Sequence, residues 1–430
     1  MRIDIINLGC SKNLVDSESL MTQLIARGHQ LRIDPARVNA DLLIVNTCGF
    51  IHDAMEESIN VLLEAIEARN AGRIKKIMAM GCLVQRYRKD LQTELPEVDD
   101  WFGVDELAGL LKSLGSEFNP ELLNQRIHST PRHYAYLKIS EGCNRNCAFC
   151  AIPAIRGKYV SRSIEDLVSE AKFLASKGVR ELILIAQDLS YYGRDRYRKS
   201  MLLPLLNQLE EITGIEWIRL HYAYPNDVNS QLIKKIASSE KICNYLDIPV
   251  QHISNRMLRK MKRGISKERT QSLIQQLREE IPNLSLRTTL LVGHPGETDR
   301  DFEELRAFVE QVRFDRLGIF TYSPEEGTYA DTHYEDDVPD EIKQERLSIL
   351  METQQKISAG LNQEKVGKQL KVLIDREEGN YYVGRSEYDS PEVDPEILVT
   401  SEHRQLRNGR FYQVKITAFS DYDLFGTVDF

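Results

Sequence analysis

Three closely spaced cysteines in the middle of the chain carry the strongest chemical signal. Cys143, Cys147 and Cys150 form a CxxxCxxC pattern directly after a predicted strand. Three thiolates on one tight loop can bind three irons of a 4Fe–4S cluster, which usually takes four Cys ligands. The fourth iron then stays open and can chelate the amino and carboxylate groups of S-adenosylmethionine. The loop therefore predicts cofactor chemistry in which the cluster cleaves S-adenosylmethionine to a 5′-deoxyadenosyl radical.

A structural zinc site is the alternative for this loop. Zinc takes four closed ligands, usually as paired Cys or Cys/His sets. The loop has no fourth Cys or His, and the nearest candidates are His128 and His133. The spacing therefore favours an iron–sulfur cluster.

Two regions are candidate contacts for S-adenosylmethionine. Phe149 lies between the second and third cysteine, where its ring could lie against the adenine or simply pack in the core. Thr289 and Gly293 end a predicted strand, and the backbone at Gly293 can approach an adenosyl group closely because it lacks a side chain. The following stretch, His294 to Glu297, is either part of this site or an ordinary turn.

A second set of cysteines lies near the N-terminus. Cys10, Cys48 and Cys82 each fall at the end of a predicted strand, and each has a glycine beside it. In a parallel sheet these strand ends lie on one edge, so the thiols can converge, and glycine lets the backbone come close to a bulky inorganic body. We predict a second three-cysteine cluster; the alternative is three unrelated buried thiols, since free Cys is often a small buried hydrophobe. Cys243 has no such company and is interpreted as structural.

Length and composition limit the class of protein. The 430 residues predict two or three domains, and 42% hydrophobic with 28% charged residues is typical of a globular protein. No stretch approaches the roughly 18 uninterrupted apolar residues of a membrane span. The chain runs from Met1 directly into a strand-like stretch, so we expect no signal peptide and a cytoplasmic location. The net charge of −9 argues against a general nucleic-acid coat, and seven cysteines in such a chain do not suggest disulfides.

The elements that position these residues form three segments of an α/β chain. The first, 1–125, alternates strands with helical patterns such as Asp16–Arg27 and predicts a mostly parallel sheet. The last, 366–430, has alternating apolar patterns divided by turns and predicts a small all-β, five-stranded barrel. The predicted strands of the first segment are Ile3–Leu8, Asp41–Asn46, Lys76–Met80 and Trp101–Val104.

The middle segment, 134–365, repeats a strand-then-helix unit six times. Six units are too few for a closed eight-stranded barrel, so we predict an open, partial (β/α)6 barrel with its chemistry at the carboxyl ends of the strands. The predicted strands are Tyr136–Ser140, Glu181–Ala186, Trp217–Tyr222, Tyr245–Val250, Ser285–Val292 and Leu317–Thr321. The predicted helices are Ile164–Ser176, Met201–Ile212, Val228–Ala237, Lys267–Glu280, Asp301–Val312 and Glu341–Leu361.

The order of these segments resembles the methylthiotransferase family of radical S-adenosylmethionine enzymes over essentially the whole chain. Residues 8–18 (LGCSKNLVDSE), 152–157 (IPAIRG) and 384–394 (GRSEYDSPEVD) carry the resemblance. Within the family they look most like the branch that methylthiolates an aspartate of ribosomal protein S twelve. The sister branch, the MiaB-like enzymes, modifies an isopentenylated adenosine of tRNA and is the alternative.

The resemblance implies a role for each segment. It gives an auxiliary 4Fe–4S cluster to Cys10, Cys48 and Cys82, supports Cys143, Cys147 and Cys150 as ligands of the radical cluster, and makes the last segment an OB-like TRAM module. It further implies two S-adenosylmethionine per turnover: one methylates a sulfur at the auxiliary cluster, and the other yields the radical that takes the β-hydrogen of aspartate. Implied partners are protein S twelve, free or on the 30S subunit, and an electron donor such as flavodoxin. We expect a monomer.

Two features bear on this resemblance. The Gly-Gly-Glu motif common after the second strand of radical enzymes is here Ala186-Gln-Asp188, so Gln187 is the candidate contact for the amino group of the methionine moiety. Residues 366–430 have 8 Lys or Arg and 12 Asp or Glu, a net charge of −4. A module that grips tRNA should be positive, whereas a negative one complements a basic ribosomal protein or is an ordinary solvated face. A non-catalytic Fe–S or zinc protein whose β-module binds a partner is a further alternative.

Overall fold

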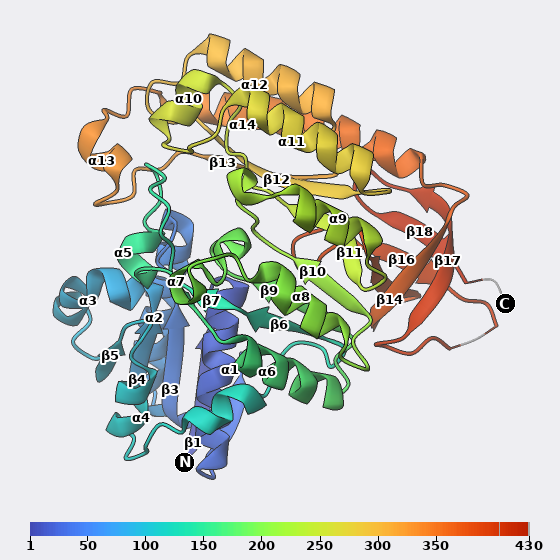
Figure 1. Ribbon diagram of the computed structural model, residues 1–430. Helices are drawn as coiled ribbons and strands as arrows, with labels where there is room; N and C mark the ends of the chain where they lie inside the picture. Colours follow the sequence, from blue (N-terminus) through green and yellow to red (C-terminus); the bar gives the residue numbers. More distant parts are fainter. Residues whose placement is uncertain (404, 429–430) are drawn as a thin grey trace.

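Three sheets follow one another along the chain and divide the structure into three parts (Figure 1). The computed structural model describes residues 1–403 and 405–428, so residues 404, 429 and 430 of the expected C-terminal module lie outside the described residues. The N-terminal sheet and the central sheet are parallel, and the C-terminal strands form a closed barrel. This arrangement confirms the predicted fold class.

The first part is a five-stranded sheet with the strand order β2-β1-β3-β4-β5. The central strand β3 is buried along almost its whole length, because α1 and α4 cover one face of the sheet and α2 and α3 cover the other. The elements are β1 (Arg2–Asn7), α1 (Ser11–Ala26), β2 (Gln30–Ile33), β3 (Ala40–Thr47), α2 (His52–Asn70), β4 (Ile74–Gly81), α3 (Cys82–Glu94), β5 (Asp100–Phe102), α4 (Leu107–Ser113) and a 3-10 helix (Pro120–Gln125).

Two details of this part differ from the prediction. Helix α1 begins at Ser11, before the expected Asp16, and Cys10 is its N-cap. Its polar first turn is stabilised by long-range contacts: Asn13 Nδ2 donates hydrogen bonds to Leu8 O at 2.9 Å and Thr47 O at 3.1 Å. The edge strand β2 was not predicted, because it alternates exposed and half-buried residues and has no apolar run.

The second part is a six-stranded parallel sheet in sequential order, β6-β9-β10-β11-β12-β13, and β6 and β13 are its free edges. This confirms the open (β/α)6 arrangement. Its strands are β6 (Tyr134–Lys138), β9 (Glu181–Ile185), β10 (Trp217–Leu220), β11 (Ile242–Asp247), β12 (Ser285–Val292) and β13 (Arg316–Thr321), with the hairpin β7 (Ser140–Glu141) and β8 (Val160–Ser161) beside β6. Its helices are α5 (Ile152–Arg156), α6 (Ile164–Ser176), α7 (Arg194–Tyr197), α8 (Leu202–Glu210), α9 (Ser230–Ser238), α10 (Asn255–Lys260), α11 (Lys267–Glu280), α12 (Asp299–Val312), α13 (Tyr329–His333) and α14 (Asp340–Gln363).

Helix boundaries in this part follow the predictions more closely than strand boundaries. Helices α6 and α11 have the predicted bounds, and Ser163 caps α6 by accepting a hydrogen bond from the Asp166 N–H at 3.1 Å. Strand β11 lies earlier than predicted, because the chain leaves the ladder after Asp247 and returns only at Gln251, which bridges Leu290.

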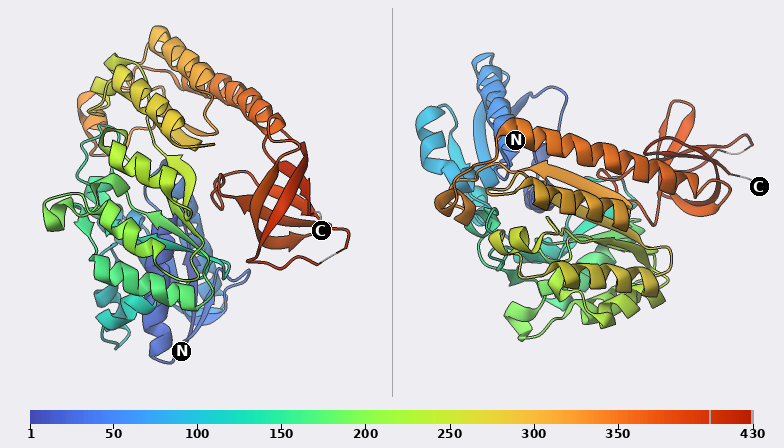
Figure 2. Two further views of the ribbon diagram at one scale, coloured as in Figure 1. Left: turned by 45° about the vertical axis from the view of Figure 1, so that its right-hand side comes forward. Right: turned by 90° about the horizontal axis from the view of Figure 1, so that it is seen from above.

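The third part is a closed barrel with the strand order β14-β15-β16-β18-β17. Helix α14 runs from the central sheet to this barrel (Figure 2). The barrel interior is apolar, with Val372, Ile374, Val399 and Val414 among its buried residues. The strands are β14 (Gln369–Glu378), β15 (Tyr381–Ser386), β16 (Ile397–Thr400), β17 (Phe411–Phe419) and β18 (Leu424–Thr427).

The inner face of the central sheet is covered by the other two parts of the chain. Alternate residues of β6 and β9 pack on the outer helices, whereas Tyr136 and Ile183 point inward and contact Leu14 and Val15 of α1. The remaining part of the inner face is covered by the loop between β15 and β16, residues 387–394, which we name the 387–394 loop. Both flanking parts therefore share one interior with the central sheet.

The 387–394 loop is held in this interior by hydrogen bonds and ion pairs. Tyr136 Oη donates to Glu392 at 3.0 Å, and Tyr245 Oη donates to Asp394 at 2.8 Å. Arg287 pairs with Asp394 at 3.3 Å. A carboxylate in a protein interior is stable only with such partners, so the loop and the inner face of the sheet are stabilised together.

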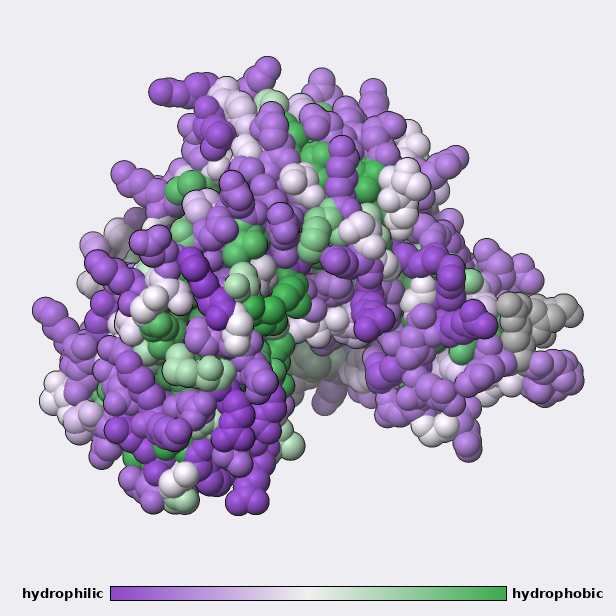
Figure 3. Space-filling view, turned by 90° about the horizontal axis from the view of Figure 1, so that it is seen from below, coloured by the Kyte–Doolittle hydropathy of each residue, from purple (hydrophilic) through white to green (hydrophobic). Residues whose placement is uncertain are grey.

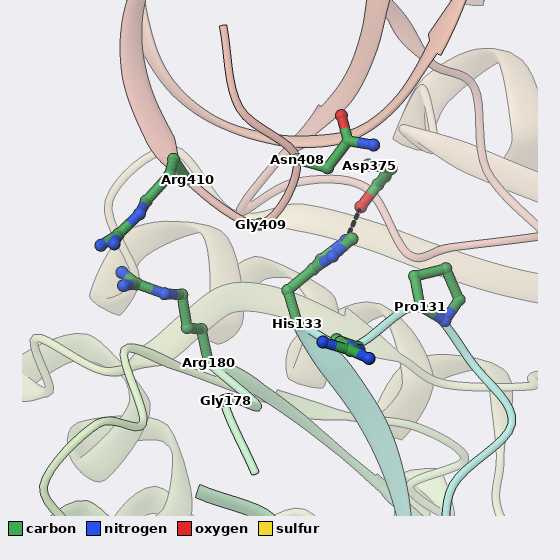
Figure 4. Close-up of a pocket in the computed structure, with 9 residues that line it drawn as sticks. Pro131, His133, Gly178, Arg180, Asp375, Asn408, Gly409 and Arg410 are labelled. Atoms are coloured by element: carbon green, nitrogen blue, oxygen red, sulfur yellow. Dashed lines mark hydrogen bonds and ion pairs between the residues drawn. The ribbon is translucent and has the colours of Figure 1, made fainter.

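A cavity of about 530 Å³ marks the seam between the central sheet and the barrel (Figure 4). His133 Nε2 lies 2.7 Å from Asp375 Oδ1, and Arg180 and Arg410 point toward each other across the opening. This cavity lies at the amino ends of the central strands, whereas the candidate site residues lie near the carboxyl ends. We therefore do not assign the predicted chemistry to it.

The surface seen from below is mainly hydrophilic, with hydrophobic side chains in separate patches (Figure 3). The same view shows a hollow between the N-terminal part and the C-terminal barrel. Among the described residues, no helix is both long and apolar enough to cross a membrane.

A buried ion-pair network joins the first and second parts. Arg126, which is 1% exposed, pairs with Glu18 of α1, and its Nε lies 2.8 Å from Glu170 of α6. Glu170 also accepts a hydrogen bond from Arg162 at 2.6 Å. The two helices are thus linked through one buried guanidinium.

Replacing Arg126 with Met should destabilise the protein, because Glu18 would remain buried without a cation. We expect R126M to lower the free energy of unfolding in urea by about 3–5 kcal/mol. R37M, at an exposed position, should change it by less than about 0.5 kcal/mol. Equal stability of the two variants would contradict this role.

Candidate radical and auxiliary cysteine sites

The CxxxCxxC loop lies between the β7 strand and α5, close to the carboxyl ends of the central strands. Its ends are fixed by backbone hydrogen bonds, from Cys143 N to Gly157 O at 3.1 Å and from Ala148 N to Met261 O at 3.0 Å. The side chain of Arg263, 3% exposed, donates to Cys147 Sγ at 3.1 Å. The sequence analysis did not identify Arg263, because its partner lies more than one hundred residues away.

The three thiols of this loop influence one another. Burial raises the pKa of Cys143 to about 11 and that of Cys150 to about 12, and the neighbouring Cys147 contributes to both increases. Cys143 and Cys150 are therefore protonated near neutral pH before metal binds. Iron binds thiolates, so loading of a cluster releases protons at this site.

The second set of cysteines lies at three strand ends of the N-terminal sheet. Cys10 precedes α1, Cys48 follows β3 and Cys82 begins α3. Cys48 and Cys82 are buried and Cys10 is exposed. The structure therefore brings all three to one edge of the sheet, as the sequence analysis predicted.

The glycines beside these cysteines allow close packing of the strand ends. A Cβ on Gly9 would lie 2.8 Å from Cys48 Cβ, and one on Gly49 would lie 2.5 Å from the Leu83 backbone. A Cβ on Gly81 would lie 2.5 Å from Thr47 O. The glycines thus let the strand ends approach one another; the expected approach to an inorganic body stays a prediction.

Arg156 and Asn13 connect the two sets of cysteines. Arg156 lies in α5, directly after the CxxxCxxC loop, and its Nη2 donates to Cys82 Sγ at 3.3 Å and also to Asn13 Oδ1. Its Nη1 pairs with Glu141 at 2.9 Å. Both residues lie in stretches that carried the family resemblance, but spacing alone gave them no role.

The thiol pKa values differ within the second set. Burial raises the pKa of Cys82 to about 11, against the opposing effect of Arg156. Desolvation also acts on Cys10, but the positive charges of Lys12 and Arg156 together with backbone N–H groups outweigh it, so the pKa of Cys10 is lowered. Cys10 is therefore exposed to solvent and lies near positive charges that favour its thiolate.

The structure places the four candidate S-adenosylmethionine contacts as follows. The Phe149 ring lies 6.4 Å from the ring of His294, in an edge-to-face arrangement next to the loop. Gln187 donates to Glu141 Oε1 at 3.0 Å, and its own buried Oε1 has no partner among the described residues. Thr289 is part of β12, and its carbonyl accepts a hydrogen bond from Gln251 N at 2.8 Å. Gly293 has a left-handed φ of +72°, and a side chain there would meet Lys343, so packing is sufficient to explain this glycine.

The donor atoms fit iron–sulfur clusters. Each set supplies three cysteines, and the seventh, Cys243, is buried elsewhere against Trp217 and Tyr245, which confirms its structural role. Within residues 1–403 and 405–428, no three His, Cys, Asp or Glu side chains are placed to share one metal ion.

Comparison with protein families divides the chain in the same order as the three sheets. Residues 2–103 match the Uncharacterized protein family UPF0004, residues 137–309 match the Radical SAM superfamily, and residues 366–428 match the TRAM domain. The UPF0004 match contains Cys10, Cys48 and Cys82, and the Radical SAM match contains the CxxxCxxC loop.

Relatives of nearly the same length share about half of the sequence. "Ribosomal protein uS12 methylthiotransferase RimO" of Bacteroides fragilis is 53% identical over 426 residues, 99% of each chain. The protein of the same name from Bacteroides thetaiotaomicron is 52% identical over 427 residues, 99% of this chain and 98% of the relative. The chain belongs to the RimO family. As a member of this family it is a radical S-adenosylmethionine methylthiotransferase, whose cofactors are an iron–sulfur cluster and S-adenosylmethionine.

Solved structures share the fold of this RimO family member at low sequence identity. The radical S-adenosylmethionine methyltransferase TsrM from Kitasatospora setae is 13% identical, covers 88% of this chain and 79% of its own, and has a TM-score of 0.55. OxsB, a cobalamin-dependent S-adenosylmethionine radical enzyme, is 12% identical, covers 82% of this chain and 56% of its own, and has a TM-score of 0.53. These similarities show the fold alone.

The interior that the central sheet shares with its two flanking parts contains a buried acidic group. Asp247, which is 1% exposed, lies at the end of β11 and pairs with Arg287 at 3.2 Å. Burial raises the pKa of Asp247 to about 6, although Arg287 opposes this shift. The unfolded chain releases this proton at lower pH, so the carboxyl contributes stability below its ordinary pKa and loses it as the pH rises through about 6.

We expect D247N to become more stable relative to the wild-type protein as the pH rises. At pH 4 the two free energies of unfolding should be similar, and by pH 7.5 their difference should change by about 3 kcal/mol in favour of D247N. Urea unfolding at a series of pH values measures this difference. D41N should show almost no trend over this range, because a hydrogen bond from Lys75 lowers the pKa of Asp41 to about 2 and its carboxylate is already ionised at pH 4. A pH-independent difference for D247N would contradict the raised pKa.

Proposed function

We propose that this enzyme adds a methylthio group to the β-carbon of an aspartate in ribosomal protein uS12. The strongest support is that about half of the residues, over nearly the full length, are identical to those of relatives named ribosomal protein uS12 methylthiotransferase RimO. That identity does not favour the MiaB-like alternative on tRNA. The structure adds that two three-cysteine sets lie at one shared interior, which suits a reaction that joins radical formation to sulfur transfer.

Each set of three cysteines holds one 4Fe–4S cluster in this proposal. Residues 1–125 carry the auxiliary cluster on Cys10, Cys48 and Cys82, residues 134–365 form the radical domain, and residues 366–430 form the TRAM module. When bound, the clusters and S-adenosylmethionine supply the radical that removes the β-hydrogen and the sulfur that replaces it. The proposed contacts of S-adenosylmethionine remain Phe149, Gln187, Thr289 and Gly293. Among them, Gln187 has a buried Oε1 without a hydrogen-bond partner in the described residues, which can accept a hydrogen bond from the ligand.

The chain's own residues orient the ligands and exclude water. Arg263 and Arg156 each donate to one cysteine sulfur, at 3.1 Å and 3.3 Å, and such hydrogen bonds orient a ligand and adjust its basicity. Helix α1 and the 387–394 loop cover the inner face of the sheet, so the interior is shielded from bulk solvent. A shielded site protects a reactive carbon radical from side reactions.

The charge of the TRAM module gives weaker support for a basic partner than the sequence suggested. Asp375 pairs with Arg385 at 2.6 Å, Asp389 pairs with Arg316, and Asp394 pairs with Arg287. These acidic groups neutralise arginines inside the protein and do not face a partner. The choice of uS12 therefore rests on the relatives.

The remaining parts of the proposal concern partners and location. We propose that the substrate is met free or on the 30S subunit, that a reductant such as flavodoxin supplies electrons, and that the enzyme is a cytoplasmic monomer. An enzyme that modifies a ribosomal protein works where ribosomes are, which supports this location.

Mass spectrometry of both candidate substrates tests the proposed function. Anaerobic, reconstituted and reduced enzyme with S-adenosylmethionine should add the mass of a methylthio group to an aspartate of recombinant uS12 and leave tRNA unchanged. Modification of tRNA in place of uS12 would refute the choice of substrate. Failure to form 5′-deoxyadenosine would refute radical chemistry itself.

Iron analysis tests the two-cluster count. The reconstituted wild-type protein should hold about eight irons, and each triple variant, C10A/C48A/C82A or C143A/C147A/C150A, should hold about four. C243A should keep all of them, because Cys243 belongs to neither set. A triple variant with the wild-type iron content would contradict the assignment of that set.

A further inference from the structure

Lys12 lies next to the auxiliary cysteines, at the interior that α1 and the central sheet share. It is in the first turn of α1, two positions after Cys10, and its residue is only 9% exposed. Because α1 packs its Leu14 and Val15 against the inner face of the central sheet, this first turn is held at the sheet's inner surface. A lysine in this position brings a positive charge inside the protein.

The ammonium group of Lys12 contacts an aromatic ring. Its Nζ lies 3.8 Å from the centroid of Tyr222, a cation–π contact. Tyr222 follows β10 and has a φ of +64°, a left-handed conformation that is rare for an aromatic residue. Strained residues of this kind cluster at functional sites, where the surrounding structure holds them in place.

Lys12 forms no ion pair or hydrogen bond through its ammonium group in the part of the chain that the structure describes. The other cations near this interior are engaged: Arg263 donates to Cys147 Sγ at 3.1 Å, and three more have carboxylate partners. Lys138 pairs with Glu141 at 2.7 Å, Arg219 pairs with Glu181 at 2.7 Å, and Arg287 pairs with Asp247 at 3.2 Å. Among these described residues, Lys12 is thus the cation whose charged group has neither an ion pair nor a hydrogen bond.

Electrostatic effects show which groups Lys12 faces. Desolvation lowers the pKa of His221 and raises that of Asp247, and the charge of Lys12 moves both downward. Lys12 also lowers the pKa of Cys10. His221 is engaged by Ser390 at 2.8 Å. Asp247 pairs with Arg287 through Oδ2, and its buried Oδ1 has no hydrogen-bond partner among the described residues. Lys12 therefore lies near both the auxiliary cysteines and the carboxyl ends of β10 and β11. It forms no ion pair with a carboxylate among the described residues.

A buried cation without an anion is costly, and the cost falls when a ligand supplies the missing charge. We propose that Lys12 binds the side-chain carboxylate of the aspartate that the enzyme modifies. This inference rests on the proposed function and names a residue that recognises its substrate. The carboxylate is bonded directly to the β-carbon, so one ion pair here would hold that carbon near the auxiliary cysteines and select aspartate over a neutral residue.

The test compares uS12 that carries either Asp or Asn at the modified position. The wild-type holoenzyme should bind and turn over the Asp form with the lower Kd and KM. K12M should raise the Kd and KM for the Asp form by about 10- to 100-fold, the range expected for loss of a charge-assisted hydrogen bond, and should no longer distinguish Asp from Asn. K12R, which keeps the charge, should retain part of the discrimination.

Two controls separate binding from a structural role. K172M removes a lysine from the exposed outer face of α6 and should match the wild-type enzyme in every measurement. Iron content of K12M and of the smaller change K12Q shows whether the adjacent Cys10 still holds its cluster. Loss of iron from both, or an equal loss of affinity for the Asp and Asn forms, would overturn the assignment in favour of a structural role.

The remaining outcomes are also decisive. If the wild-type enzyme modifies uS12 and K12M still prefers Asp over Asn, the Lys12 assignment is wrong while the proposed function stands. If the wild-type enzyme leaves uS12 unmodified, the proposed function is wrong and the assignment falls with it.

Discussion

The inner face of the central sheet must be covered, and the sheet cannot do this by itself. Parallel strands are stable when both faces are buried. Six strands cover one side with their own helices but do not close into a barrel, so residues such as Tyr136, Tyr245 and Arg287 would otherwise face solvent. Helix α1 from the N-terminal part and the 387–394 loop from the C-terminal part supply the missing surface. Most features of the candidate site follow from this need.

Covering the inner face with α1 also sets the position of the auxiliary cysteines. Cys10 is the N-cap of α1, so docking of Leu14 and Val15 on the sheet fixes where Cys10 lies. Asn13 then links the ends of β1 and β3, and Arg156 joins this edge to the CxxxCxxC loop. The two sets of cysteines are thus held in one frame by packing and hydrogen bonds between the chain's own residues.

Much of the fold could be predicted because its signals are local. The spacing of apolar residues and the Ser163 cap were enough to bound α6, and six strand–helix repeats were enough to predict an open barrel. The convergence of Cys10, Cys48 and Cys82 followed from the rule that parallel strands end on one edge. Residues whose roles depend on distant partners could not be found in this way. Arg156, Arg263 and Lys12 resemble ordinary basic residues until folding places them beside Cys82, Cys147 and Tyr222.

The 387–394 loop also has a consequence for how the protein is assembled. A ribosome releases the N-terminal parts of a chain first, and domains generally fold as units in that order. The first two parts can therefore fold while the part of the inner face that the 387–394 loop later covers is still open. Arg287 and Tyr245 gain Asp394 only when the last strands have been made. Docking of the C-terminal barrel is thus the last folding step that buries the inner face of the central sheet.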